Sequence, residues 1–384
     1  MLLEQMERSE RDGTSDSACV DQYSYTHTIL AWCRANEPDS IEKIFEVFAK
    51  CKERDLDEAF DVQLDSVVFE TIFLALSSMK SKENALKAVK LLEEMIALYK
   101  GGRVDLKPSS KCINLVVKAH SSSTGWSNAE PSRLHDLVIS LANAFKLGNI
   151  YMDHIAFNIA VQNWTRANKT VAPNKGLFLR NKMNEIGISP SAQCNLSMMN
   201  AYAKSDWHNV AVQAQKFVNT LDENEMNLHC YNVMLNLWAK SDSNEKVMKC
   251  RQILEHMHTV GKVDVISYNT VMNACAFSEA KDENEKRKHL NEAQRTHEEL
   301  LQFLDPDEIS FATIVKASRK LSSSEDELDR MLKETFETCS RRGFLGKVVI
   351  REFKYSTTPE KRLELFGNDL EGTICSQWVR HIND

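Results

Sequence analysis

Apolar residues recur at intervals of three and four along most of the chain, which is the spacing of one face of an α-helix. In residues 85–96, Ala85, Val89, Leu92 and Met95 form one such apolar stripe. A stripe of this kind must be buried against another element, because a single helix cannot hide it from water. The pattern therefore predicts amphipathic helices that pack on one another.

The helical pattern repeats along the chain. Residues 264–276 and residues 227–239 match in register, and lining up the rest of the chain on them gives eight units spaced 36 to 44 residues apart. The first column of this alignment contains only Asp, Ser or Asn: Asp21, Asp65, Ser109, Asp153, Ser191, Asn227, Asp264 and Asp307. These side chains satisfy the free N–H groups at a helix start, so the column predicts the N-cap of a first helix in each unit.

Each unit contains a second predicted helix. It begins about 15 residues after the start of a unit's first helix, at another polar cap or proline: Ser40, Asn84, Pro131, Pro173, Asn244 and Asn284. Ten residues after the first column, six of eight positions are alanine, which predicts close contact between helices: Ala31, Ala75, Ala119, Ala201, Ala274 and Ala317. A helix hairpin of this size cannot bury both faces alone, so stacked hairpins, an α-solenoid, are the predicted fold.

Composition narrows the function classes. Gly (12) and Pro (7) are scarce in 384 residues, which disfavours sandwiches, barrels and Gly-rich nucleotide-binding loops. No apolar run approaches the length that spans a bilayer, so we expect no membrane association. The net charge of −7 restricts any nucleic-acid contact to a local face. The ten cysteines never form Cys-x-x-Cys, which predicts reduced thiols rather than disulfides.

Motifs for catalysis are missing. The Pro-Cys-x-x-Cys half of a zinc deaminase site is absent, and Gly101-Gly102 stands alone between predicted helices rather than in a phosphate-binding loop. The acidic group at 305–308 coincides with a repeat start, so it is better explained as a capping loop than as a metal site. We therefore expect no enzymatic activity, no catalytic metal and no cofactor.

The string Ser-Tyr-Asn-Thr-Val-Met-Asn-Ala-Cys-Ala at 267–276, with the repeat length and the helix pairs, resembles the pentatricopeptide-repeat family. The resemblance covers about residues 21–343, and the spacing of tetratricopeptide repeats is absent. It implies an all-α, right-handed α-α superhelix of about eight helix hairpins. Residues 1–20 are then the remnant of a preceding repeat helix, and residues 344–384 are a C-terminal cap.

Proteins of that family read one RNA base per repeat with the fifth residue of the first helix and the last residue of the repeat. By this resemblance, Thr26 with Asp65 would read G, and Asn158 with Ser191 would read C. Asn114 with Asp153, Asn232 with Asp264, and Asn269 with Asp307 would each read U. An Asn amide offers both a donor and an acceptor, which suits the mixed edge of a pyrimidine. Glu70 with Ser109 and Leu196 with Asn227 match no base.

The second position of the first helix is where the family contacts base faces. Tyr23, Val67, Ile155, Ile266 and Ile309 suit such contacts, and we name Ile155, Ile266 and Ile309 as RNA-binding candidates. Lys111, Gln193 and His229 depart from the pattern, and we expect Lys111 to contact all RNAs alike.

The sequence thus predicts a sequence-selective adaptor for single-stranded RNA in organelle RNA processing, stability or translation, with RNA-processing proteins as further partners. The alternative is a protein-binding helical scaffold, in which the Asn column only joins neighbouring repeats. The resemblance implies a mitochondrion or a plastid. The acidic N-terminus shows no targeting peptide, and Leu2–Met6 looks like the middle of a helix, which predicts a truncated N-terminus.

Overall fold

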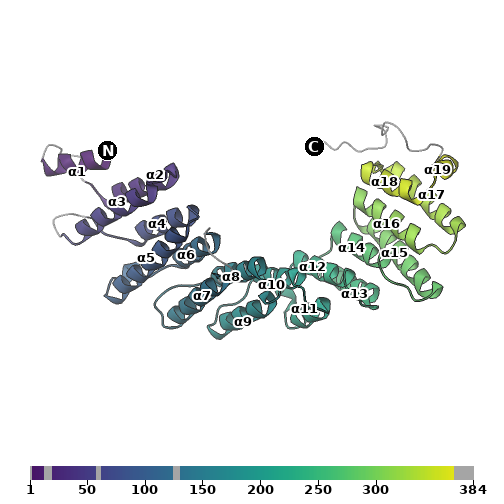
Figure 1. The fold of residues 1–384 in the computed structure, drawn as a ribbon, viewed down its shortest axis with the longest axis horizontal. Coiled ribbons are helices and arrows are strands. Elements are labelled where there is room, and N and C mark those ends of the chain that lie inside the picture. The colour runs from purple at the N-terminus through teal and green to yellow at the C-terminus, as the bar shows by residue number, and fades with distance from the viewer. Residues whose placement is uncertain (1, 13–19, 58–61, 124–129, 367–384) are drawn as a thin grey trace. The chain divides into compact units, whose positions relative to one another are not determined.

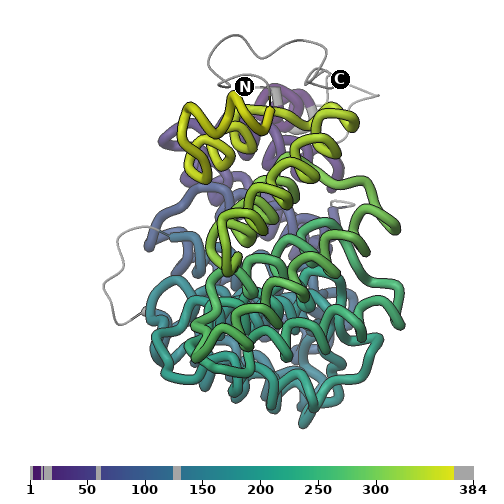
Figure 2. Tube along the Cα trace, turned by 90° about the vertical axis from the view of Figure 1, so that its right-hand side faces the viewer, coloured from purple at the N-terminus to yellow at the C-terminus, as the bar shows by residue number. Residues whose placement is uncertain are grey.

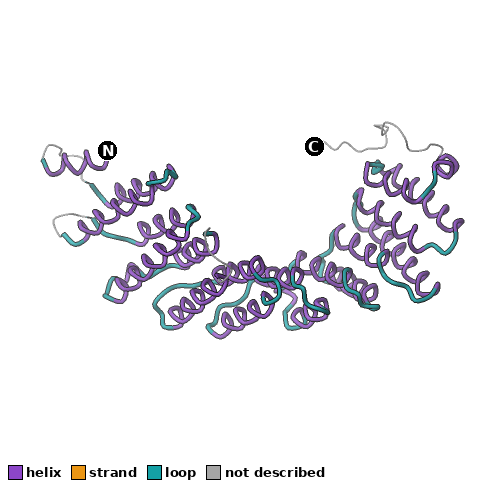
Figure 3. The backbone as a smooth tube through the Cα atoms, viewed as in Figure 1, coloured by secondary structure: helices purple, strands orange, loops and turns teal. Residues whose placement is uncertain are grey.

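The computed structural model describes residues 2–12, 20–57, 62–123 and 130–366. Figure 3 shows helices joined by loops, with no strand among the described residues, which confirms the predicted all-α class. The chain divides into two compact units, an N-terminal unit (1–205) and a C-terminal unit (206–384).

The N-terminal unit begins with α1 (Leu2–Arg11) and continues as four helix pairs (Figure 1). These are α2 (Gln22–Ala35) with α3 (Ser40–Asp55), α4 (Ser66–Ser78) with α5 (Lys82–Lys100), α6 (Ser110–Ser122) with α7 (Glu130–Lys146), and α8 (His154–Ala167) with α9 (Ala172–Glu185). The 3-10 turn η1 (Val104–Leu106) follows α5, and α10 (Ala192–Lys204) ends the unit. The first helices α2, α4, α6, α8 and α10 pack on one another in that order, and α2, α4, α6 and α8 each also pack on their own second helix.

The C-terminal unit repeats the arrangement. After α11 (Val210–Val218) and the 3-10 turn η2 (Glu223–Glu225) come three pairs: α12 (Leu228–Ala239) with α13 (Lys246–Thr259), α14 (Val265–Ala276) with α15 (Glu283–Phe303), and α16 (Glu308–Leu321) with α17 (Glu325–Arg342). Helices α18 (Lys347–Ser356) and α19 (Pro359–Phe366) follow. Figure 2 shows these helices, from green to yellow, as successive layers.

All eight residues of the predicted capping column are N-caps. Each has an extended backbone, and its side chain accepts a hydrogen bond from a backbone N–H in the first turn. Asp264 and Asp307 form full capping boxes with Ser267 and Ser310. The second helices start within two residues of the predicted positions. The repeat register inferred from local sequence is therefore confirmed.

The alanine column is buried at five of its six positions, as close helix contact requires. Ala31 is exposed, so the prediction was wrong there. Among the described first helices, α2 packs on one other first helix, α4, whereas α4, α6, α8 and α14 each pack on two. An end position of the stack leaves part of the column uncovered.

The C-terminal end continues the stack beyond the last pair. Helix α18 packs on α16, and Val349 and Phe353 are fully buried there with Phe311 and Leu332. The Glu308 carboxylate accepts a hydrogen bond from the backbone N of Val348 at 2.6 Å, at the start of α18. This arrangement suits the proposed cap over residues 344–384, of which residues 367–384, with Trp378, lie outside the described part.

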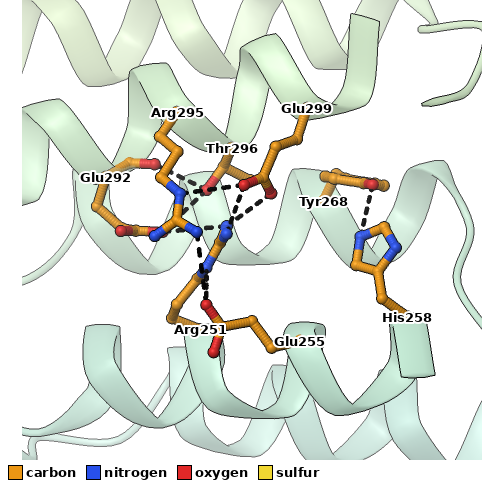
Figure 4. A network of polar contacts seen from close by, with 8 residues as sticks. All are labelled: Arg251, Glu255, His258, Tyr268, Glu292, Arg295, Thr296 and Glu299. Atoms are coloured by element: carbon orange, nitrogen blue, oxygen red, sulfur yellow. Dashed lines mark hydrogen bonds and ion pairs between the residues drawn. The ribbon is translucent and has the colours of Figure 1, made fainter. Parts of the chain in front are cut away.

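An ion network around the largely buried Arg251 joins the second helices α13 and α15 (Figure 4). The Arg251 guanidinium contacts Glu255 at 2.9 Å, Glu292 at 3.3 Å and Glu299 at 2.7 Å, and Arg295 contacts Glu299 at 3.1 Å. Nearby, the Tyr268 hydroxyl of α14 lies 2.7 Å from Nε2 of His258. These contacts fix the spacing of neighbouring hairpins around α14, the helix that carries Asn269.

Candidate nucleic-acid interface

The second position of every first helix, two residues after the N-cap, is exposed to solvent. The eight side chains are Tyr23, Val67, Lys111, Ile155, Gln193, His229, Ile266 and Ile309. Five of them are large and apolar, with exposed fractions from 42% at Ile155 to 68% at Tyr23. Because the fifth position follows three residues later, it lies on the same side of each helix. We call the side formed by these two positions the first-helix face.

Three Asn residues at the fifth position join neighbouring first helices. Asn232 Nδ2 donates to both carboxylate oxygens of Asp264 at 3.1 Å, and Asn114 Nδ2 donates to those of Asp153 at 3.2 and 3.1 Å. Asn269 Nδ2 donates to Asp307 Oδ1 at 3.2 Å. The structure thus brings together the three pairs that the sequence pattern combined as uracil readers.

The amide oxygens of these Asn residues point away from solvent. Oδ1 of Asn114 and Oδ1 of Asn269 are buried without a hydrogen-bond partner in the described structure, and Oδ1 of Asn232 accepts from the Ser267 hydroxyl at 2.7 Å. What each pair can offer to a ligand is therefore an amide N–H donor beside a carboxylate acceptor.

Two of the predicted base-reading pairs lack a direct hydrogen bond between their two side chains. The Thr26 hydroxyl donates to the backbone oxygen of Gln22 at 3.0 Å, and it is the Gln22 side chain that donates to Asp65. No hydrogen bond joins Asn158 and Ser191 in the described structure: Ser191 caps Cys194, and Oδ1 of Asn158 is buried without a partner. These two repeats thus lack the Asn–Asp geometry.

The pair that matched no base, Glu70 with Ser109, is also joined. The Ser109 hydroxyl donates to Glu70 Oε1 at 2.8 Å, and the Lys111 ammonium donates to Glu70 Oε2 at 2.7 Å. The hydrogen bond and charge of Glu70 raise the pKa of Lys111. Lys111, which departs from the apolar pattern of the second position, is therefore the partner of a fifth-position carboxylate.

Five basic side chains lie thirteen residues after the N-caps. They are Arg34, Arg166, Lys204, Lys240 and Lys320, and all five are exposed. This position continues the helical row of the second and fifth positions. A cation at a helix C-terminus also stabilises the helix, so the signal is visible only once the eight caps are aligned. The Lys320 ammonium lies 3.5 Å from the ring centre of exposed Phe277, the residue at the same position one repeat earlier.

A polar hollow lies between two first helices of the N-terminal unit. A cavity of about 340 Å³ is lined by residues of α8 and α10, among them Arg166, Gln193 and Lys204. At its wall, Gln162 Nε2 donates to the Ser197 hydroxyl at 3.2 Å. The hollow offers hydrogen-bond donors and positive charge in one place.

Other reactive side chains are buried or hydrogen-bonded within the fold. Cys194, Cys230 and Cys275 are buried, and burial raises the pKa of the Cys230 thiol. His256 and His258 each face a tyrosine hydroxyl, from Tyr231 and Tyr268. Within the described ranges, no cluster of three or more potential ligands could hold a metal ion, and none of the helices could span a membrane.

Comparison with known proteins shows the fold. No family model matches the sequence, and no curated protein matches it significantly. The structure is similar to the crystal structure of the pentatricopeptide repeat protein PPR10 from maize, with a TM-score of 0.54 and 16% identity, over 94% of this chain and 45% of that one. The chain thus spans less than half the length of this relative. A structure of PPR10 in complex with an 18-nt psaJ RNA element matches with a TM-score of 0.35 and 14% identity, over 91% of this chain and 60% of that one.

Proposed function

We propose that this chain, which has the pentatricopeptide-repeat fold, is an adaptor that binds single-stranded RNA with base selectivity along its first-helix face. The observation that carries the proposal is the exposed apolar row at the second position, beside the Asn–Asp pairs of the fifth. The proposal gives the chain the same class of ligand as PPR10, which was crystallised with RNA.

The apolar row is what a purely structural role leaves unexplained. Hydrogen bonds between neighbouring repeats already account for Asn at the fifth position, since they satisfy polar groups inside the stack. They do not account for Ile266 and Ile309, which are 61% and 55% exposed. Large apolar side chains that recur at one register on a solvated face are suited to stacking against ligand rings, as bases do on protein platforms.

The polar pairs beside the row favour particular bases. A donor N–H from Asn next to an acceptor carboxylate matches an edge with an acceptor next to a donor. Uracil presents such an edge in O4 and N3–H, and guanine presents the same order in O6 and N1–H. Cytosine and adenine present the reverse order, an amino donor next to a ring-nitrogen acceptor. This complementarity supports uracil or guanine at the repeats of Asn114, Asn232 and Asn269, and the family resemblance assigns uracil to Asn paired with Asp.

The cations supply the remaining part of the RNA affinity, which does not depend on the base sequence. Five cations lie on the same side of their helices as the proposed base-reading positions, where the phosphates of a bound strand would follow: Arg34, Arg166, Lys204, Lys240 and Lys320. Their charge gives an acidic protein a local strip of cations within each of its two units. We infer a non-catalytic role in RNA processing, stability or translation, exerted in a mitochondrion or plastid by protecting RNA or recruiting processing proteins.

Selection of bound sequences tests the proposal directly. The full chain would be incubated with a randomised pool of short single-stranded RNAs, and the enriched RNA would be titrated at several salt concentrations. We expect enrichment of adjacent uracils and a logarithm of affinity that falls linearly with the logarithm of salt. Equal binding of the enriched RNA and its scrambled partner would refute base selectivity.

Matched variants separate RNA contact from general surface effects. Ile266→Ser changes an exposed apolar residue of the first-helix face, and Met248→Ser changes one of similar exposure on the second helix α13 of the same unit. We expect Ile266→Ser to weaken RNA binding and Met248→Ser to leave it unchanged. Loss in neither variant, together with no enriched RNA, would favour the protein-binding scaffold.

A further inference from the structure

The repeat formed by α4 and α5 carries a different polar group from its neighbours on the first-helix face. The fifth position is Glu70 instead of Asn or Thr, and the capping residue of the following helix is Ser109 instead of Asp. The carboxylate has therefore moved from the capping residue to the fifth position. Its side chain is 19% exposed, so it lies at the surface but is largely fixed by its surroundings.

Two partners hold the Glu70 carboxylate, one on each oxygen. Ser109 donates to Oε1 at 2.8 Å and Lys111 donates to Oε2 at 2.7 Å. A carboxylate oxygen accepts two hydrogen bonds, so each oxygen retains capacity for one more. The group is thus positioned as a pair of acceptors with no donor between them.

Only one base has a Watson–Crick edge that suits a pair of acceptors. Guanine places N1–H and the N2 amino group side by side, so both carboxylate oxygens can accept from it at once. Uracil has a single N–H between two oxygens, which would repel the carboxylate. Cytosine and adenine place a ring-nitrogen acceptor beside their amino group, so one carboxylate oxygen would face a lone pair.

The positive charge of Lys111 offsets the negative charge of the Glu70 carboxylate beside RNA. An unpaired negative charge on this face would be repelled by phosphates and would be costly to desolvate under a base. The Lys111 ammonium, whose side chain is 69% exposed, neutralises Glu70 and still has further donors free for the strand. Its place at the second position of α6 explains why the following repeat lacks an apolar residue there, whereas α4 carries Val67.

We propose that Glu70 is the specificity-determining residue of a guanine-reading repeat, in which both carboxylate oxygens accept from N1–H and N2–H of one base while Ser109 and Lys111 fix the carboxylate. This inference rests on the proposed RNA-binding function. With the guanine expected at Thr26 and Asp65, and the uracil expected at Asn114 and Asp153, the N-terminal unit reads two guanines beside a uracil.

The test compares sequences selected by the wild-type chain and by Glu70→Gln, which keeps the shape but replaces one acceptor by a donor. We expect one guanine column, between a guanine and a uracil, to lose its preference by about tenfold or more, with the other columns unchanged. Glu93→Gln, an exposed change on the second helix α5, serves as the control and should leave every column as in the wild type.

A chemical change in the RNA makes the test independent of any variant. Replacing that guanine by inosine removes only the N2 amino group and should weaken wild-type binding by about tenfold. The same replacement should have little effect on Glu70→Gln, and 7-deazaguanine, which keeps N1–H and N2–H, should bind like guanine. If Glu70→Gln does not fold by circular dichroism, the inosine series on the wild type decides.

The outcomes separate the two proposals. RNA selection that succeeds with no column altered by Glu70→Gln, or with inosine bound as well as guanine, overturns the guanine assignment and leaves RNA binding intact. Failure of the wild-type chain to enrich any RNA overturns the proposed function, and the assignment with it.

Discussion

Replacement of Arg251 by methionine tests how much the ion network contributes to the C-terminal unit. The methionine keeps much of the apolar stem but removes the guanidinium that faces Glu255, Glu292 and Glu299. Although burial opposes a charge at this place, the hydrogen bonds to Glu299 and Glu255 raise the pKa of Arg251. The variant therefore removes a permanent charge and leaves its carboxylate partners behind.

The size of the effect follows from the burial of those partners. Breaking a buried ion pair by removing one side costs about 3–5 kcal/mol, because the other charge remains without compensation. Glu292 and Glu299 keep 18% and 21% of their side-chain surface in water, and Arg295 still contacts Glu299 at 3.1 Å. We therefore expect Arg251→Met to lower the free energy of unfolding by about 2–3 kcal/mol.

The loss should depend on pH. Burial raises the pKa of Glu292 above its ordinary value of 4.5 even with Arg251 in place, and without the guanidinium it should rise further. A carboxyl whose folded-state pKa is raised lowers stability as pH increases from about 4.5 through that pKa. The difference between variant and wild type should therefore be largest at pH 7 and should narrow as the pH falls toward 4.5.

Urea unfolding followed by circular dichroism gives the free energy, and hydrogen exchange followed by mass spectrometry localises the loss to α13 and α15. Arg295→Met is the matched control: Arg295 shares Glu299 and Glu255 with Arg251, but its side chain is 56% exposed. We expect that control to cost under about 1 kcal/mol. Equal losses in the two variants would show that burial is not what makes Arg251 important.

Three further predictions follow from the described contacts. Asn269→Thr should shift base preference at its repeat from U toward G, by about 5- to 150-fold in the affinity ratio. Competition between U- and G-containing RNAs at fixed salt measures this shift. An unchanged ratio would show that the Asn column has only a structural role. Arg166→Gln should reduce the slope of log affinity against log salt by about 1 without changing base preference, and a changed preference would contradict its assignment to the strip of cations. Burial, with the charge of Arg342 nearby, lowers the pKa of His297 from 6.5 to about 4. The stability that the neutral imidazole provides is therefore complete above pH 6.5. It is lost as the pH falls from 6.5 toward 4, at about 1.4 kcal/mol per pH unit. Urea unfolding between pH 7 and 4 should show a flatter pH dependence in His297→Leu, and an identical slope would refute this.

Local chemistry determined the helix starts, and for that reason they could be predicted. An N-cap is a hydrogen bond between a side chain and a backbone N–H two or three residues later, so Asp264 or Asn227 specifies it without reference to the rest of the chain. Exposure of the second position follows equally from its place in the first turn. The family resemblance put Ile266 and Ile309 at base-contacting positions, and both lie on a solvated face.

Contacts between repeats were decided by the tertiary structure. The Asn232 amide meets a carboxylate 32 residues away, and whether such a pair forms depends on how two helices stack, which single-helix periodicity does not contain. The same capping column gives a direct Asn–Asp pair at Asp264 but a contact from Gln22 at Asp65. Sequence pattern alone therefore identified the candidate readers without identifying which of them are paired.

The Glu70 and Arg251 groups depend most on tertiary structure. Glu70 matched no base by pattern, and only the positions of Ser109 and Lys111 on the next helix show what its carboxylate can accept. Arg251 and Glu299 are separated by 48 residues and lie on second helices, whose sequences carry no shared column. Caps and stripes come from interactions within a few residues, whereas ion pairs and candidate base-reading groups come from side chains that only the stacking of hairpins brings within about 4 Å.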